Sequence, residues 1–306
     1  MSRILVTGVD GFTGRYLAPA LAAEGHEVHG LVQRTPEPGQ PMQTGVHVLH
    51  ACDLLDPAGL LRVVDQVRPD KVVHLAGIAF VGHGDVGAIY STNLVGVRHL
   101  LAALAAVAGG DAPPSAVLLA SSANIYGNNT AGVIDESAPA APTNDYAVSK
   151  LAMEYMAWTW RQRLPITVVR PFNYTGVGQS EDYLLPKIVA HVRRRAAFIE
   201  LGNLDVERDF SDVRTIASIY RQLLGANAVN QTFNVCSGHG QTLRGVLDMV
   251  SELAGSRLEV RVNPAFVRDN EVKRLLGSKA ALERCIGPVE GPSIRDTLAW
   301  MLHAPA

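Results

Sequence analysis

Short apolar runs alternate with longer amphipathic segments through the first half of the chain. Runs typical of buried strands occupy 4–6, 27–32, 46–49, 72–75, 116–120 and 166–169. Helical patterns fall between them, at 16–23, 56–67, 88–107 and 146–160. Strands that alternate with helices predict an α/β fold, a doubly wound parallel sheet with right-handed crossovers.

The regular alternation ends after Pro171. Glycines and short helical segments then surround isolated strand patterns at 231–235 and 258–262. We therefore expect a main sheet domain over 1–172 and a smaller α/β lobe built mainly from 173–306, with some later segments returning to the sheet.

Composition excludes several classes of function. The 306 residues carry a formal net charge of -2, which gives no overall field for nucleic acid or an acidic membrane. Three cysteines, Cys52, Cys236 and Cys285, are too few and too scattered for a disulfide framework or a cysteine-rich metal site. The first strand begins at once, without a leader, and no run is apolar for long enough to span a bilayer. A cytoplasmic location is expected.

A glycine-rich turn follows the first strand. Gly8, Gly11 and Gly14 are three residues apart, with Phe12 and Thr13 between the last two. Such a turn lets a pyrophosphate approach the amide groups at a helix N-terminus, and its alternative role is tight packing of helix on strand. The strand–turn–helix context favours a dinucleotide site of the Rossmann type.

The ends of the next strands indicate which dinucleotide binds. The second strand ends at Arg34 without the acidic residue that usually meets a free ribose hydroxyl. Arg34 can pair with a 2′-phosphate, which favours NADP over NAD and leaves NAD open. Asp53 and Leu54 follow the third strand, where the adenine is expected. The small residues of Leu75-Ala76-Gly77 after the fourth strand leave room for the cofactor.

Tyr146 and Lys150 are spaced to lie on one helix face, one turn apart. An ammonium so placed can hold the phenol as a proton donor or acceptor. Ser121 and Ser122 end the fifth strand and could supply a hydroxyl to the same reacting oxygen. Together with a dinucleotide site, these groups indicate hydride transfer at a carbinol carbon.

The order of these motifs resembles the extended short-chain dehydrogenase/reductase family, in its sugar-nucleotide branch. The shared stretches are 7–14, 74–77, Asn93 in Ser-Thr-Asn-Leu-Val-Gly, 121–127, Tyr146 with Lys150, and 170–173. The resemblance implies that Asn93 contributes to the cofactor site, that Tyr146 is the catalytic acid/base and that Lys150 holds the nicotinamide ribose. It also implies that Ser122 contacts the sugar oxygen, with Ser121 competing for that role.

The second half is similar to the GDP-mannose branch of that family, in the stretches 170–179, 202–213, 233–238 and 271–279. The branch binds a GDP-sugar in its second lobe. The resemblance implies a substrate site made of Asn124, Asn173, Lys187, Arg208, Arg268 and Glu271. Cationic side chains suit the diphosphate and a carboxylate suits the ribose hydroxyls.

The residue types favour reduction within this branch. A 4,6-dehydratase needs a further acid/base, usually a glutamate at the position of Asn124, and an amide cannot exchange protons near neutral pH. Asp135 and Glu136 are close in sequence and could replace it. We expect reduction of the C4 ketone of GDP-4-keto-6-deoxy-D-mannose to GDP-6-deoxy-D-mannose (GDP-D-rhamnose). The alternatives are a 4-epimerase, a 4,6-dehydratase or a non-catalytic NADP sensor.

Two further expectations concern metals and assembly. Four histidines between positions 47 and 83 are on different segments without a ligand motif, so no metal site is expected. The helices near 88–107 and 145–163 are rich in Ala, Leu, Met and Trp. In related proteins the matching helices often form a four-helix dimer interface, which implies a homodimer here.

Overall fold

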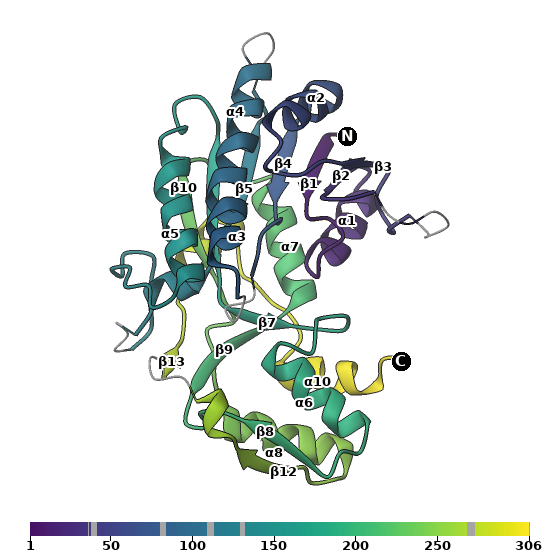
Figure 1. The fold of residues 1–306 in the computed structure, drawn as a ribbon, viewed down its shortest axis with the longest axis vertical. Helices are drawn as coiled ribbons and strands as arrows, with labels where there is room; N and C mark the ends of the chain where they lie inside the picture. Colours follow the sequence, from purple (N-terminus) through teal and green to yellow (C-terminus); the bar gives the residue numbers. More distant parts are fainter. Residues whose placement is uncertain are drawn as a thin grey trace.

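The computed structural model describes residues 1–35, 37, 42–79, 84–108, 113–128, 132–267 and 273–305. Its main sheet has seven strands, all parallel (Figure 1). In spatial order they are β10 (Gln231–Val235), β6 (Ile166–Pro171), β5 (Ala116–Ala120), β4 (Lys71–His74), β1 (Arg3–Thr7), β2 (Glu27–Val32) and β3 (Val48–Ala51). The predicted doubly wound α/β fold is confirmed.

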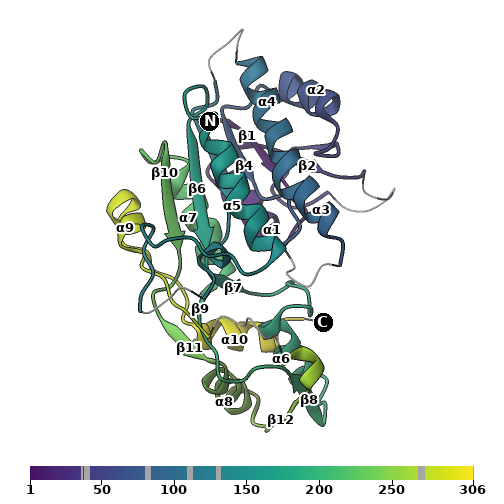
Figure 2. The same cartoon turned by 60° about the vertical axis from the view of Figure 1, so that its left-hand side comes forward.

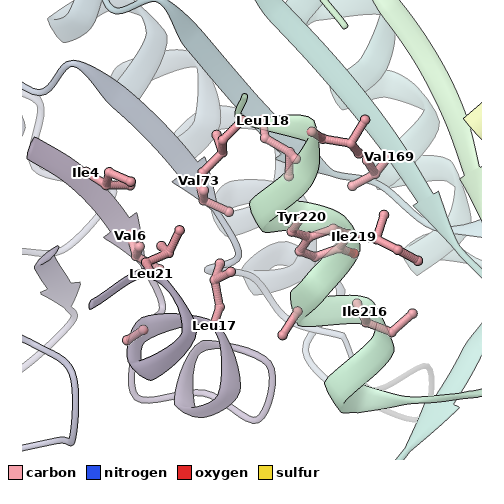
Figure 3. Close-up of a cluster of buried hydrophobic side chains, with 14 of the residues drawn as sticks. Ile4, Val6, Leu17, Leu21, Val73, Leu118, Val169, Ile216, Ile219 and Tyr220 are labelled. Atoms are coloured by element: carbon pink, nitrogen blue, oxygen red, sulfur yellow. The ribbon is translucent and has the colours of Figure 1, made fainter. Parts of the chain in front are cut away.

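Helices cover both faces of this sheet, which explains why its strands are nearly continuous apolar runs. One face packs against α1 (Gly14–Ala23) and α7 (Val213–Leu223), and the buried side chains between them include Ile4 and Val6 (Figure 3). The other face packs against α2 (Pro57–Val67), α4 (Val97–Val107) and α5 (Asp145–Trp158). Leu5 points to that second cluster, as the two-residue strand period requires.

Two predicted elements differ from the observed ones. The third strand begins at Val48, two residues later than expected, because Val46 packs into the core before the strand pairs with β2. The expected helix over 88–107 is α3 (Val86–Tyr90), a π-helical turn η1 (Ser91–Gly96) and α4 in succession. Such turns occur often at functional sites.

The second lobe lies below the carboxyl edge of the sheet in Figures 1 and 2. Its strands are β7 (Asn173–Thr175), β8 (Phe198–Leu201), β9 (Glu207–Asp212), β11 (Gly240–Thr242), β12 (Glu259–Val262) and β13 (Arg274–Leu275). Its helices are α6 (Leu184–Arg193), α8 (Leu243–Ala254) and α10 (Ile294–His303), which share one apolar cluster. The short helices η2 (Ala123–Tyr126) and η3 (Pro264–Phe266) lie in loops, and α9 (Ala280–Ile286) packs near β10.

Three absences hold for the described ranges. No helix there is both long and apolar enough to cross a membrane. No group of three or more His, Cys, Asp or Glu side chains is close enough there to hold a metal ion. Cys52, Cys236 and Cys285 are free thiols.

Candidate functional site

The glycine turn packs backbone against backbone. Gly8 has φ +66°, and a Cβ there would lie 2.7 Å from both the Cα and the N of Ala76, at the end of β4. A Cβ on Gly14 would lie 2.2 Å from the carbonyl oxygen of Val9. The Gly11 amide donates to the Gly8 carbonyl at 3.0 Å, which closes the turn. The turn therefore requires glycine at positions 8 and 14, and it ends at the N-terminus of α1, where backbone amides can bind a pyrophosphate.

Aromatic side chains connect this turn to the second lobe. The hydroxyls of Thr13 and Tyr174 are 2.8 Å apart, and the ring of Phe12 is nearly parallel to that of Tyr174 with centroids 5.9 Å apart. The hydroxyl of Tyr16 donates to the carbonyl of Val177 at 2.6 Å. Sequence reasoning missed Tyr174 as a partner of the turn, because 161 residues separate it from Thr13.

The end of β2 carries the residues expected around the adenosine ribose. Arg34 is exposed. The Asp53 carboxylate accepts from the Gln33 amide at 3.0 Å and from the Leu55 N–H at 2.8 Å. These hydrogen bonds, and then the charge of Arg34, lower the pKa of Asp53. Leu54 is buried, so only its backbone could line a cofactor site.

Asn93 fixes the segment that follows β4. It lies on η1, and its side chain accepts from the Ile78 N–H at 2.9 Å and donates to the Ile78 carbonyl at 3.0 Å. It also donates to the Ser149 hydroxyl at 3.1 Å. A Cβ on Gly77 would lie 2.8 Å from the Asn93 Oδ1 and 3.4 Å from the Lys150 Nζ. Asn93 therefore shapes the cofactor site by holding a loop, and glycine at 77 keeps space beside the lysine.

His74 is a buried neutral side chain beside this segment. Its Nδ1 is 2.8 Å from the Thr7 hydroxyl, and the following amide, that of Leu75, donates to the Thr7 carbonyl at 3.1 Å. Burial, and to a lesser degree the charge of Lys150, lowers the pKa of His74 to about 3. The imidazole therefore adds no positive charge to the site near neutral pH.

Tyr146 and Ser122 meet at the carboxyl edge of the sheet. Asn144 caps α5 by accepting from the Ala147 N–H at 2.9 Å, which places Tyr146 in the first helical turn. The tyrosine is 7% exposed, and the Ser122 hydroxyl is near enough to its phenol to influence it. Burial raises the phenol pKa and outweighs the opposing effect of Ser122. The phenol is therefore protonated at neutral pH and can donate a proton.

Lys150 lies one turn further along α5 and is also buried. Its ammonium donates to the Ala120 carbonyl, at the end of β5, at 2.9 Å. Burial lowers the pKa of this amine to about 8, and the carboxylate of Glu154 opposes that effect. The amine is thus close to its titration point near neutral pH, which suits a group that tunes a neighbouring phenol.

The two serines have different partners. The Ser121 hydroxyl donates to the buried Glu154 carboxylate at 2.5 Å, whereas the Ser122 oxygen accepts from the Asn124 N–H at 3.2 Å and lies near the Tyr146 phenol. Asn124 itself is half-buried on η2. Ser122 is therefore the serine that the structure brings to the tyrosine.

The two acids that could have replaced a missing glutamate are engaged elsewhere. Asp135 accepts from the Ser137 N–H at 2.9 Å, and Glu136 accepts from the Asn234 N–H at 2.7 Å. The first contact is local, whereas the second ties this segment to β10 of the main sheet.

Of the predicted substrate residues, Asn124 lies on η2, between β5 and α5, and Asn173, Lys187 and Arg208 lie in the second lobe. On β7, the Asn173 amide donates to the Asp209 carbonyl at 3.3 Å. Lys187 on α6 donates to the Glu200 carbonyl at 2.9 Å, and Arg208 on β9 donates to the Glu207 carbonyl at 3.0 Å. Arg268 and Glu271 lie outside the described residues. The structure therefore shows internal contacts for the side chains of Asn173, Lys187 and Arg208.

Comparison with curated proteins finds similar sequences along nearly the whole chain. A GDP-6-deoxy-D-mannose reductase of Pseudomonas aeruginosa is 33% identical, covering 98% of this chain and 96% of that one. A GDP-6-deoxy-D-talose 4-dehydrogenase of Aggregatibacter actinomycetemcomitans is 31% identical, covering 93% and 91% respectively.

Solved structures agree with these matches. A putative epimerase from Burkholderia cenocepacia superposes with a TM-score of 0.90 and 52% identity, covering 98% of this chain and 96% of that one. RMD from Pseudomonas aeruginosa, solved with NADPH, superposes with a TM-score of 0.82 and 31% identity, covering 99% and 98%. The family model for GDP-mannose 4,6-dehydratase matches residues 5–290. The chain therefore belongs to the GDP-mannose 4,6-dehydratase family, within the extended short-chain dehydrogenases/reductases.

Proposed function

We propose that this protein reduces the C4 ketone of GDP-4-keto-6-deoxy-D-mannose to GDP-6-deoxy-D-mannose, with NADPH as the reductant. The observation that carries the proposal is the cluster of Ser122, Tyr146 and Lys150 at the carboxyl edge of the sheet, next to the glycine turn. The relative named GDP-6-deoxy-D-mannose reductase supports the choice of substrate.

The mechanism follows from the protonation states in the cluster. The protonated phenol of Tyr146 gives its proton to the C4 oxygen, and the Ser122 hydroxyl orients that oxygen. The ammonium of Lys150 stabilises the phenolate that remains. A bound nicotinamide supplies the hydride that reduces the carbon. Burial of the cluster excludes water and strengthens each of these electrostatic contacts.

The same cluster argues against dehydration. Elimination across C5 and C6 requires another acid/base, and Asn124 has no titratable proton. Asp135 and Glu136 are held by Ser137 and Asn234, and Glu154 is paired with Arg170. Reduction needs only the phenol, the serine and the lysine, so it is the reaction for which these side chains suffice.

One assay distinguishes the candidate reactions. Protein incubated with GDP-4-keto-6-deoxy-D-mannose and NADPH should consume the absorbance of reduced nicotinamide, and Tyr146→Phe should lower kcat by roughly 10²–10⁴-fold. No loss of absorbance would remove the proposal. Turnover of a GDP-sugar without added cofactor would favour a 4-epimerase, and release of the ketone from GDP-mannose would favour a dehydratase.

The configuration of the product at C4 distinguishes two possible products of the same reduction. The relative named GDP-6-deoxy-D-talose 4-dehydrogenase makes the C4 epimer a second candidate. The proton coupling between C3 and C4 of the purified product differs between the epimers. Coupling of the 6-deoxymannose type is the expected result.

NADPH is the proposed cofactor because Arg34 is an exposed cation at the end of β2. Residues that would hold the cofactor are Gly8, Gly11, Phe12, Thr13 and Gly14 at the turn, Arg34 at the ribose, Asp53 and Leu54 at the adenine, and Leu75, Ala76, Gly77, Asn93, Tyr146 and Lys150 near the nicotinamide. A charge-assisted hydrogen bond to the 2′-phosphate contributes about 1.5–3 kcal/mol. Arg34→Ala should therefore raise KM for NADPH by roughly 10–150-fold and leave KM for NADH unchanged. Equal effects on both cofactors would contradict this assignment.

The substrate lobe is proposed to bind the GDP-sugar through Asn124, Asn173, Lys187, Arg208, Arg268 and Glu271. Lys187 and Arg208 supply cations for the diphosphate, once their bonds to backbone carbonyls are exchanged for bonds to the ligand. Lys187→Met should raise KM for the GDP-sugar and leave KM for NADPH near its original value. A change confined to NADPH would contradict this role.

A homodimer through a four-helix bundle is proposed from the outer faces of two elements. Val148 and Tyr155, seven residues apart on α5, are exposed, as is Val95 on the adjacent η1. Met153, in contrast, is buried in the core of the same chain. Sedimentation should give a dimer, and Tyr155→Asp should weaken it. A wild-type monomer at micromolar concentration would remove this proposal.

A further inference from the structure

A buried carboxylate lies behind the proposed catalytic pair. Glu154 is four residues after Lys150 and eight after Tyr146, so the three side chains follow one face of α5. Glu154 is only 3% exposed. A buried carboxylate is costly unless charged and hydrogen-bonded partners surround it, so its partners indicate what it does.

Two side chains contact this carboxylate directly, one from β6 and one from the end of β5. The Arg170 guanidinium, on β6, donates from Nη2 to Oε2 of Glu154 at 2.7 Å and from Nε to Oε1 at 3.0 Å. Ser121, at the end of β5, donates to Oε1 at 2.5 Å. Arg170 also donates to the Tyr126 hydroxyl at 2.8 Å, which donates to Asn234 on β10 at 2.7 Å. The carboxylate thus connects the proposed catalytic helix to the carboxyl ends of β5, β6 and β10.

The protonation of the Lys150 amine depends on the charged groups around it, and Glu154 is the carboxylate among them. The groups that influence this amine are His74 on β4 and Glu154 on its own helix. The phenol of Tyr146 and the imidazole of His74 are neutral near pH 7, because burial raises the first pKa and lowers the second. Arg170, on β6, carries a positive charge that Glu154 neutralises through the bidentate pair. Removing the Glu154 charge would therefore remove the carboxylate that favours the charged form of Lys150 and leave the Arg170 cation unbalanced.

The hydrogen bond to Ser121 has a separate geometric effect. Ser121 and Ser122 directly follow β5, and both hydroxyls face side chains of α5. With the Ser121 hydroxyl held by Glu154, the next residue, Ser122, meets the Tyr146 phenol. The same carboxylate therefore acts on two of the three proposed catalytic groups without touching the substrate.

We propose that Glu154 is a positioning residue for the reduction: its charge keeps the Lys150 amine protonated, and its bond to Ser121 turns Ser122 toward Tyr146. This inference rests on the proposed function, because it assigns a task within that reaction. Arg170 completes this arrangement by pairing with the Glu154 carboxylate in a buried site.

The test is the pH profile of Glu154→Gln. Glutamine keeps the shape and an oxygen that can accept from Ser121, but it removes the charge. The alkaline limb of kcat/KM should move to lower pH by about one unit, equal to a tenfold loss of the protonated amine above that pH. Glu252→Gln is the matched control, because Glu252 pairs with Arg295 at 2.9 Å in an exposed site. Its profile should coincide with that of the wild type.

Arg170→Met provides a second measurement of opposite sign, should the glutamine variant fail to fold. Removing the guanidinium leaves the full Glu154 charge beside Lys150, so the alkaline limb should move to higher pH. A limb that stays at the wild-type pH in a folded variant, with a uniformly lower rate, shows a purely structural role and overturns the inference. Loss of wild-type NADPH oxidation is a different result, which removes the proposed function itself.

Discussion

The close approach of the glycine turn to the end of β4 can be tested with a matched pair of variants. Gly8 and Gly25 both have positive φ, +66° and +79°. A Cβ on Gly8 would lie 2.7 Å from two backbone atoms of Ala76, whereas a Cβ on Gly25 meets no described atom within 4 Å. Gly25→Ala therefore introduces backbone strain alone, and Gly8→Ala adds a clash that only movement of the backbone can relieve.

The two contributions are of similar size. An alanine in the left-handed region costs roughly 1–2 kcal/mol at either position. Forcing atoms into a close-packed site adds about 1–3 kcal/mol at position 8. The free energy of unfolding should therefore fall by roughly 1–2 kcal/mol in Gly25→Ala and by roughly 2–5 kcal/mol in Gly8→Ala.

Cofactor binding gives a second, independent readout. Relief of the clash would separate the turn from Ala76, so Gly8→Ala should raise the Kd for NADPH at least tenfold, whereas Gly25→Ala should leave it unchanged. Denaturant unfolding and the fluorescence of bound NADPH measure the two effects. Equal losses of stability, or wild-type NADPH binding by Gly8→Ala, would refute the idea that this contact shapes the site.

Four other variants test buried polar groups. The Tyr220 hydroxyl is buried and has no hydrogen-bond partner among the described residues, so Tyr220→Phe should leave the free energy of unfolding unchanged or raise it by about 1–3 kcal/mol; a loss in denaturant unfolding would contradict this. Because the His74 pKa is about 3 when folded and 6.5 otherwise, the unfolded chain binds more protons between these values. Stability should thus fall as pH drops through that window, and less steeply in His74→Gln. Ser122→Ala should lower kcat, whereas Ser121→Ala should mainly lower stability; the reverse pattern in steady-state kinetics and thermal melting would exchange their roles.

Much of the main sheet could be predicted because its strands are buried on both faces. Runs such as 27–32 and 116–120 coincide with β2 and β5, since every residue of such a strand contacts a core. The edge strand β3 was misplaced by two residues, because Val46 belongs to the core although it lies outside the hydrogen-bonded ladder. The hydrophobic pattern of a sequence indicates which residues are buried, and a buried residue does not always belong to a paired strand.

The glycine turn and the Tyr146–Lys150 pair could be found from sequence because each depends on local spacing. The partners of Ser121 and Ser122 could not, because Glu154 is 33 residues from Ser121 and only the packing of α5 on β5 brings them together. A signal was nevertheless present. Glu154 continues the stripe of Tyr146 and Lys150 by one more turn, and a carboxylate on a face that enters the core requires a buried partner.

The two halves of the chain are distinct in sequence pattern but joined in packing. α7 and β10 both come from the second half, yet α7 packs on α1, and β10 pairs with β6 to complete the main sheet. Figure 3 shows Ile216, Ile219 and Tyr220 of α7 among side chains from β1 and β4. The Asn234 side chain on β10 accepts a hydrogen bond from the Tyr126 hydroxyl. That hydroxyl accepts in turn from Arg170, the partner of Glu154. The groups proposed for catalysis therefore lie where the second half returns to the first, so the return of the chain that completes the core also fixes the geometry behind Tyr146.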